Sequence, residues 1–353
     1  MKKIFLLLTL LSTLISSDFL SIDTFVAMHP DQKVKMEAFD ALVQDEPSKI
    51  ATKQKEAIKI AIIYPQETSD YWQRSKKSFK RRLDLLDINY TIDEYFIDLS
   101  NLMQQKKALK QVLQENNDYL IFTLNVDIHE KFINQILSRK KPKLIIQNLT
   151  TPLVQWEGNQ PFLYVGFDHL EGTKLLANYL KTRFPHGANY AMLYFKEGFV
   201  SQMRGDGFIS LMDSSFTLKD SFYTQGKIQE ATLATQKILE EHPNVDFIYS
   251  CATDVSLGAL KAMQNLQNPP LLNGWGGGAK ELELIKEKKL TFTVMRMNDD
   301  NGVAMAEAIK LDLENKTQQV PQIYSGKFML IDEKTDAEIF EAYKKRAFRY
   351  SGL

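Results

Sequence analysis

Residues 59–64 of this chain read KIAIIY, a nearly continuous apolar run that Pro65 brings to an end. Such a run is typical of a β-strand covered on both faces, as in a parallel sheet packed between helices. Residues 71–86 follow it with apolar side chains at helical spacing. A buried strand followed by an amphipathic helix is the repeating unit of a doubly wound α/β fold, so these first two elements predict that fold class.

The same unit recurs along the chain in two series. In the first series, strands are predicted at 59–64, 88–96, 119–124, 144–147 and 162–165, and helices at 71–86, 102–115, 129–139 and 170–183. In the second, strands are predicted at 190–195, 221–223, 247–251, 271–273, 291–295 and 327–331, and helices at 202–212, 229–241, 255–264, 279–288, 302–313 and 337–345. Two such series predict two doubly wound, Rossmann-like α/β lobes with a hinged cleft between them.

Two polar stretches interrupt this pattern. Residues 150–161 contain two prolines, separate the two series and are the predicted hinge between the lobes. Residues 18–56 show no clear core pattern, and we expect them to form an N-terminal leader with one short helix.

The first 17 residues predict a secretory signal peptide that is cleaved near residue 17. Lys2 and Lys3 form a basic start, residues 4–15 form an apolar segment, and Ser16 and Ser17 supply small residues at the cleavage point. The apolar segment is too short to cross about 30 Å of hydrocarbon as a helix, and an uncleaved N-terminal anchor is the alternative. We therefore expect an exported protein.

The composition argues against several functional classes. Lysine plus arginine and aspartate plus glutamate each number 44, and this near-neutral balance argues against nucleic acid as the main partner, which would require a dense basic face. Cys251 is the only cysteine, so no intramolecular disulfide can form, and it ends an apolar run as a buried thiol would. No histidine stands at metal-ligand spacing, and no GxSxG motif occurs. We predict no catalytic residue, no metal site and no enzymatic activity.

Polar and aromatic side chains gather just after the predicted strands. In an open α/β sheet, ligands bind outside the carboxyl ends of the strands, so these positions form the candidate site. Aromatic rings for stacking and many hydrogen-bonding groups suit a small polyhydroxy ligand. The residues at or near these positions include Glu67, Ser69, Trp72, Asn148, Arg204, Thr253, Asp254, Trp275 and Arg296, which become the candidate ligand-binding residues through the resemblance described below.

Several of these positions have an ordinary structural alternative. Ser69, Asp254 and Asn298 stand where helix N-caps are common, and taken singly the cap interpretation is favoured. Trp72 could belong to the core, whereas Trp275 has glycines on both sides, which fits a core position poorly. The clustering at one sheet edge, more than any single residue, predicts a site.

Several segments resemble one known family. They read SDYWQR, LIIQNLTTP, PFLYVGFDH, RGDGF, CATDVSLGA, NGWGGG, VMRMNDDNGVAMAEAIK and KKRAFRYS. From about residue 57 to 351 the chain resembles the LuxP-like autoinducer-2 receptors, which belong to the ribose-type (type I) periplasmic binding proteins. The resemblance implies two lobes joined by three crossings and a periplasmic location. It places the first lobe at 57–155 plus about 297–322 and the second at 156–296 plus about 323–353.

The resemblance also implies a ligand and a partner. The ligand would be autoinducer-2 as its furanosyl borate diester, with borate as part of the ligand and no separate cofactor. The partner would be the periplasmic domain of a membrane sensor histidine kinase. All candidate residues except Glu67 match the motif positions that contact the ligand. Since a tetrahedral borate is anionic, Arg204 and Arg296 would stabilise it through charge-assisted hydrogen bonds.

Glu67 departs from the family pattern, which has glutamine there and a loop one residue longer. A carboxylate opposes an anionic ligand unless it points away, is protonated, or accepts hydrogen bonds from a neutral sugar-like ligand. Two other functions therefore stay open. One is a periplasmic sugar-binding protein of an ABC transporter, and the other is a periplasmic enzyme acting on a sugar-like substrate.

Overall fold

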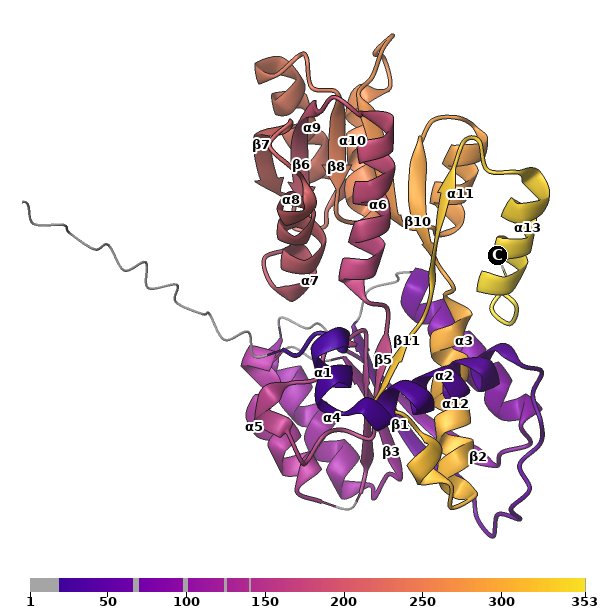
Figure 1. Cartoon of the computed structure of the whole chain (residues 1–353). Coiled ribbons are helices and arrows are strands. Elements are labelled where there is room, and N and C mark those ends of the chain that lie inside the picture. The colour runs from indigo at the N-terminus through magenta and orange to yellow at the C-terminus, as the bar shows by residue number, and fades with distance from the viewer. Residues whose placement is uncertain (1–18, 66–69, 98–100, 124–125, 140, 353) are drawn as a thin grey trace, which may run out of the picture.

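The computed structural model of the chain describes residues 19–65, 70–97, 101–123, 126–139 and 141–352 (Figure 1). They form two α/β lobes, each built on a six-stranded sheet with helices on both faces. The fold class predicted from the alternation of strands and helices is therefore confirmed. The predicted signal peptide, residues 1–17, lies outside the described residues.

The first sheet is parallel throughout, with strand order β11-β5-β4-β3-β1-β2. Its strands are β1 (Ile58–Pro65), β2 (Tyr90–Ile97), β3 (Tyr119–Thr123), β4 (Lys143–Gln147), β5 (Leu163–Gly166) and β11 (Ile323–Ser325). Its helices are α1 (Ile22–Met28), α2 (Pro30–Gln44), α3 (Asp70–Leu85), α4 (Leu102–Gln114), α5 (Val126–Leu137) and α12 (Asp299–Leu313). Successive β1 residues point to opposite faces: Ile60 packs with α2, α3 and α12, and Ala61 packs with α1, α4 and α5.

The second sheet has the order β12-β10-β9-β8-β6-β7, and β12 alone runs antiparallel to its neighbour. Its strands are β6 (Ala188–Tyr194), β7 (Phe216–Tyr223), β8 (Phe247–Ser250), β9 (Leu271–Gly276), β10 (Phe292–Arg296) and β12 (Phe328–Asp332). Its helices are α6 (His169–Arg183), α7 (Phe199–Ser201), α8 (Gly207–Leu211), α9 (Ile228–Glu241), α10 (Thr253–Met263), α11 (Ala279–Lys286) and α13 (Ala337–Ala347). Helices α6 and α8 cover one face, and α9, α10, α11 and α13 cover the other.

The chain crosses between the sheets after β5, after β10 and between β11 and β12. Two predicted boundaries are therefore wrong. Strand β5 belongs to the first sheet, so the first crossing follows Gly166 and does not lie within residues 150–161. Strand β11, which was not predicted, also belongs to the first sheet rather than to the second lobe. An apolar run shows that a strand is buried, but it does not show which sheet the strand extends.

The described part of the predicted leader, residues 19–56, is not separate from the first lobe. It forms two helices rather than one, and these pack on that lobe. Phe25 of α1 and both Phe39 and Val43 of α2 are buried, and the Phe39 ring centre lies 5.9 Å from that of Tyr324 in β11. Helix α2 buries only Phe39 and Val43. Its sequence therefore has only a weak helical period of apolar residues, and this is why no core-facing helix was predicted there.

The end of the chain returns to the first lobe. Helix α13 packs on the second sheet, and the residues after it lie against the start of α12 (Figure 1). Arg349 donates to the buried carboxylate of Asp300 over 3.2 Å, and Arg346 donates to the same side chain over 3.1 Å. The backbone N–H groups of Tyr350 and Ser351 donate to Asp299. The predicted assignment of all of residues 323–353 to the second lobe is therefore too simple.

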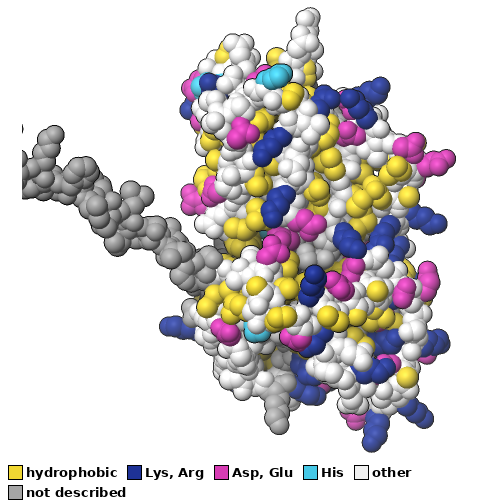
Figure 2. Space-filling view, viewed as in Figure 1, with side chains coloured by type: hydrophobic (Ala, Val, Ile, Leu, Met, Phe, Trp, Pro, Cys, Tyr) yellow, Lys and Arg dark blue, Asp and Glu magenta, His cyan; other side chains and the backbone are white. Residues whose placement is uncertain are grey.

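The visible surface carries both charges. In Figure 2, lysine and arginine side chains are intermixed with acidic ones over this face of both lobes. Within the described residues, no helix is long and apolar enough to cross a membrane.

Candidate functional site

The carboxyl edges of the two sheets face each other at the boundary between the lobes. Tyr71 lies in the first turn of α3, which follows β1, and Arg296 is the last residue of β10 in the other sheet. The guanidinium carbon of Arg296 lies 4.8 Å from the centre of the Tyr71 ring and 5.9 Å from that of Phe167. This contact joins the lobes at the sheet edge where α/β folds bind ligands.

Arg204 occupies the same boundary from the second lobe. It lies in a single π-helical turn, Gln202–Asp206, between α7 and α8. Its guanidinium carbon is 3.7 Å from the centre of the Trp275 ring, and its Nη1 donates to the Cys251 carbonyl over 2.9 Å. Its Nη2 lies 3.4 Å from Nδ1 of His169. The aromatic ring, the carbonyl and the imidazole together fix the position of this cation.

Trp275 is completely buried, although the glycines around it favoured an exposed position. It lies in β9, which continues past the predicted end at residue 273, and its ring packs under α6. A side-chain carbon on Gly172 of that helix would lie 3.0 Å from the Trp275 ring. Space for the indole is therefore made by a glycine on a distant helix, which the local sequence does not reveal.

A second glycine shapes the environment of Arg296. Gly276 has a φ of +127°, which disfavours any residue with a side chain, and a Cβ there would lie 2.3 Å from Nη2 of Arg296. The guanidinium group can therefore lie directly against the backbone at the end of β9.

The two arginines are cations in a buried environment. Burial, and then the neighbouring Arg296, lowers the pKa of Arg204, and burial also lowers the pKa of Arg296. Within the part of the chain that the structure describes, neither arginine forms an ion pair with a carboxylate. Glu281, which acts on both arginines through its charge, is held by the N–H groups of Trp275 and Gly277. This arrangement can receive an anionic group at the lobe boundary.

Asn148 and Thr253 approach this boundary from opposite lobes. Asn148 follows β4, has a φ of +67° and is half-buried, and its N–H donates to the Val165 carbonyl. Thr253 begins α10, and its hydroxyl donates to the Trp275 carbonyl over 3.1 Å. The structure therefore places both predicted residues at the expected sheet edge.

The other predicted residues divide into three groups. Glu67 and Ser69 lie outside the described residues. Trp72 is only 6% exposed and packs in the core of the first lobe, with its ring centre 5.0 Å from that of Tyr64, as the core alternative predicted. Asp254 is exposed in the first turn of α10.

The cap interpretation is wrong for the two described positions to which it was applied. The N-cap of α10 is Ala252, so Asp254 lies inside the helix. Asn298 does stand at the N-cap of α12, but its side chain makes no capping hydrogen bond. Its buried amide nitrogen has no partner among the described residues. Asn298, two residues after Arg296, therefore has a donor free of the described residues.

Three site residues were missed from the sequence: Tyr71, Phe167 and His169. Tyr71 accepts a hydrogen bond from the Asn301 amide over 3.0 Å. Phe167 and His169 follow β5, and they were overlooked because β5 was assigned to the wrong sheet. The rule that ligands bind after strand ends would have found both of them once β5 had been placed in the first sheet.

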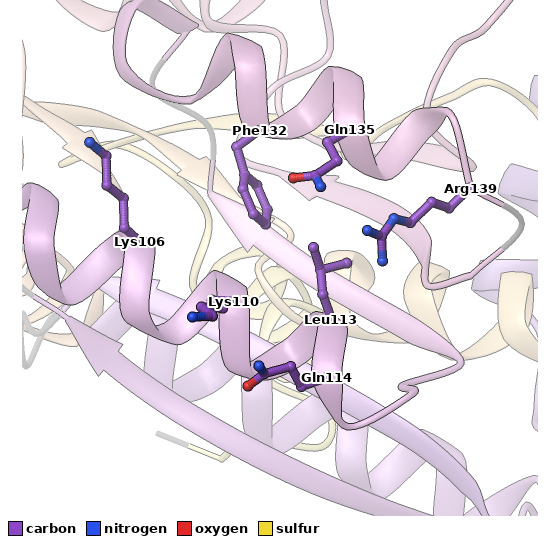
Figure 3. Close-up of a pocket in the computed structure, with 7 residues that line it drawn as sticks. All are labelled: Lys106, Lys110, Leu113, Gln114, Phe132, Gln135 and Arg139. Carbon is purple, nitrogen blue, oxygen red and sulfur yellow. The ribbon is translucent and has the colours of Figure 1, made fainter.

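A surface hollow of about 370 Å³ lies between α4 and α5 (Figure 3). It is lined by Lys106, Lys110, Leu113, Gln114, Phe132, Gln135 and Arg139. None of the candidate residues contributes to it. We therefore do not assign it as the ligand site.

The tertiary structure also gathers three potential metal ligands that the sequence spacing did not indicate. Ligand atoms of Asp220, Glu241 and His242 lie within 4.8 Å of one another at the surface of the second lobe. His242 lies 3.9 Å from Asp220, and Glu241 forms an ion pair with Lys237. Such exposed charged clusters are common, and we assign no role to this one.

Comparison with known proteins gives a family. Residues 60–317 match the family described as periplasmic binding protein domain. The ribose import binding protein RbsB of Bacillus subtilis (strain 168) is 24% identical over 156 residues, which are 44% of this chain and 51% of that protein. The chain therefore matches about half the length of this relative.

Solved structures with the same fold include binding proteins from two kinds of system. An ABC transporter solute binding protein from Bacillus halodurans C-125 with bound myo-inositol has a TM-score of 0.70 at 15% identity, covering 83% of this chain and 100% of that chain. The fructose-binding periplasmic domain of a hybrid two-component system has a TM-score of 0.68 at 16% identity, covering 81% and 93% respectively. Because the family match spans most of the chain and these structures share its two-lobed fold, the chain belongs to the type I periplasmic binding proteins.

Proposed function

We propose that this protein is an exported receptor that binds a small, anionic, polyhydroxylated ligand between its lobes, without catalysis. The observation that supports this most directly is the pair Arg204 and Arg296, two cations at the lobe boundary with no ion-pair partner among the described residues. A neutral sugar would leave both charges uncompensated away from bulk water, which is costly. An anionic ligand would offset that cost with charge-assisted hydrogen bonds.

Among anionic ligands of this size, we propose autoinducer-2 as its furanosyl borate diester. Its tetrahedral borate carries the negative charge that the two guanidinium groups would neutralise, and its ring hydroxyls suit Asn148 and Thr253 at the same sheet edge. The resemblance of the strand-end motifs to autoinducer-2 receptors points in the same direction. Borate is proposed as part of the ligand and not as a separate cofactor.

Calorimetric titration tests this proposal. The ligands would be 4,5-dihydroxy-2,3-pentanedione, the linear precursor of autoinducer-2, with and without borate, and then D-ribose, D-fructose and myo-inositol. We expect binding that requires borate, and Glu67→Gln should bind at least as tightly as the native protein. If native binding ignores borate and Glu67→Gln weakens it, the borate ligand is excluded and a neutral sugar-like ligand replaces it.

The second candidate function is a periplasmic sugar-binding protein of an ABC transporter. The myo-inositol binding protein with the same fold works in such a transporter, whereas the fructose-binding domain belongs to a two-component system. We propose that the partner here is the periplasmic domain of a sensor histidine kinase. Deleting the gene should then abolish the transcriptional response to the ligand and leave its uptake unchanged. Loss of uptake would favour the transporter.

A further inference from the structure

His169 is a buried histidine at the lobe boundary to which no role has been given. It is the first residue of α6, just after the first crossing between the lobes, and it is 4% exposed. Its ring centre lies 5.8 Å from that of Trp275 and 6.3 Å from that of Phe199. Its Nδ1 lies 3.4 Å from Nη2 of Arg204. The imidazole is therefore part of the same constellation as the two proposed anion-binding arginines.

The contact with Arg204 determines which ring nitrogen carries the proton. A guanidinium group has only hydrogen-bond donors, so Nδ1 of His169 can face it only as an acceptor. A neutral imidazole with a free lone pair on Nδ1 carries its proton on Nε2. Burial and the positive charges of Arg204 and Arg296 hold the pKa of His169 well below its usual range, which keeps the ring neutral.

The remaining ring nitrogen has no partner in the part of the chain that the structure describes. Nε2 of His169 is buried and makes no hydrogen bond to any described residue. A buried N–H without an acceptor is destabilising, and most such groups in folded proteins find a partner. Arg204 in the same site also has a buried donor, its Nε, that makes no hydrogen bond to any described residue.

We propose that His169 is a ligand-binding residue that donates a hydrogen bond from Nε2 to an oxygen of the bound ligand while its Nδ1 accepts from Arg204. This inference rests on the proposed function, because it names a further contact in the same site. The His169 side chain thus links Arg204 to the ligand. It requires that the ligand atom facing Nε2 be an oxygen that accepts a hydrogen bond. Hydroxyl, ether and borate oxygens all qualify.

The tautomer is tested directly by nitrogen NMR on protein labelled with ¹⁵N-histidine. In the free protein, the ring resonances assigned to His169 through their loss in His169→Asn should show a neutral imidazole with the proton on Nε2 from pH 5.5 to 8. Adding 4,5-dihydroxy-2,3-pentanedione with borate should shift the Nε2 and Hε2 resonances of this ring. A proton on Nδ1, or a doubly protonated ring, would overturn the proposal.

Two variants separate a ligand contact from a purely structural role. Asparagine places its amide oxygen near the position of Nδ1, so His169→Asn can still accept from Arg204 but has lost the outer donor. Glutamine places its amide nitrogen near the position of Nε2, so His169→Gln keeps a donor toward the ligand. We expect His169→Asn to weaken binding about tenfold and His169→Gln to recover part of that loss. The exposed His186→Asn serves as control and should bind like the native protein.

The outcomes distinguish this inference from the proposed function. If no ligand in the panel, including the sugars, binds the native protein, the proposed function fails and this inference fails with it. If a ligand binds but the His169 resonances stay unchanged, or if His169→Asn binds as tightly as native while His169→Gln does not, the proposed function stands. His169 then only orients Arg204. Circular dichroism and melting temperature show which variants are folded. If both misfold, the other four histidines are replaced one at a time, and the resonances that persist in all four of these variants belong to His169, so the NMR titration of the native protein still decides the matter.

Discussion

Gly276 and Arg296 are fitted to each other: a Cβ on Gly276 would lie 2.3 Å from Nη2 of Arg296. Gly276→Ala should therefore displace the guanidinium group from the lobe boundary. We expect ligand affinity to fall about tenfold or more, the cost of losing one charge-assisted hydrogen bond. Gly198→Ala is the matched control, because Gly198 has a similar φ of +123° but a Cβ there meets no atom within 4 Å. Equal losses in both variants would show that backbone strain, and not Arg296, is responsible.

The two arginines should each be required for binding an anion. Replacing Arg204 or Arg296 with alanine should cost about 1.5–3 kcal/mol of binding free energy, and lysine should also bind more weakly because it replaces a planar fork with a point charge. Titration with the autoinducer-2 precursor and borate measures both effects. Arg183→Ala, at an exposed position in the last turn of α6, should have no effect. If both alanine variants bind the ligand as tightly as the native protein, the two arginines do not bind an anionic group of the ligand.

The lobes should move when ligand binds, since residues from both sheets line the boundary. Tyr71 and Arg296 touch across it in the described conformation. Small-angle X-ray scattering should show a smaller radius of gyration with saturating ligand than without it, as in hinge closure around a ligand. An identical profile in both conditions would mean that the lobes do not rearrange.

The buried histidine should make stability depend on pH. The pKa of His169 is held well below its usual range in the folded protein by burial and by Arg204 and Arg296. In the unfolded chain it lies near 6.5, so as the pH falls below about 6.5 the unfolded state binds a proton that the folded state does not. The free energy of unfolding should then fall by up to about 1.4 kcal/mol per pH unit from this group alone.

Urea unfolding between pH 7.5 and 5 measures this dependence. The slope of stability against pH should be smaller in His169→Asn than in the native protein. The same slope in both proteins would show that His169 becomes protonated in the folded state.

The Arg82–Glu307 ion pair should be important for stability. Nη2 of Arg82 in α3 lies 2.6 Å from the carboxylate of Glu307 in α12. Both side chains are fully buried. Replacing only one partner leaves a buried charge alone, so Arg82→Ala or Glu307→Ala should lower the free energy of unfolding by about 3–5 kcal/mol. The neighbouring exposed Arg81→Ala should change it by less than about 0.5 kcal/mol. A loss below about 1 kcal/mol in both single variants would mean that water or other groups compensate the charge.

The sequence was sufficient for most of what depends on local pattern. Apolar runs such as residues 59–64 and the helical spacing that follows them predicted the α/β class and nearly all strands and helices. The predictions of strands and helices succeed because the period of apolar residues reflects the secondary structure that buries them. The rule that ligands bind at strand ends groups Asn148, Arg204, Thr253 and Arg296 at one sheet edge, and their binding of a ligand stays a prediction.

Contacts between distant segments were decided only by the tertiary structure. Whether β5 and β11 extend the first sheet depends on hydrogen bonds to strands far away in the sequence. Trp275 is buried because Gly172, on another helix, leaves room for its ring. His169 becomes a candidate donor because Arg204, 35 residues away, occupies its other nitrogen. Each of these outcomes depends on which groups meet after folding, and the local pattern of a sequence does not encode that.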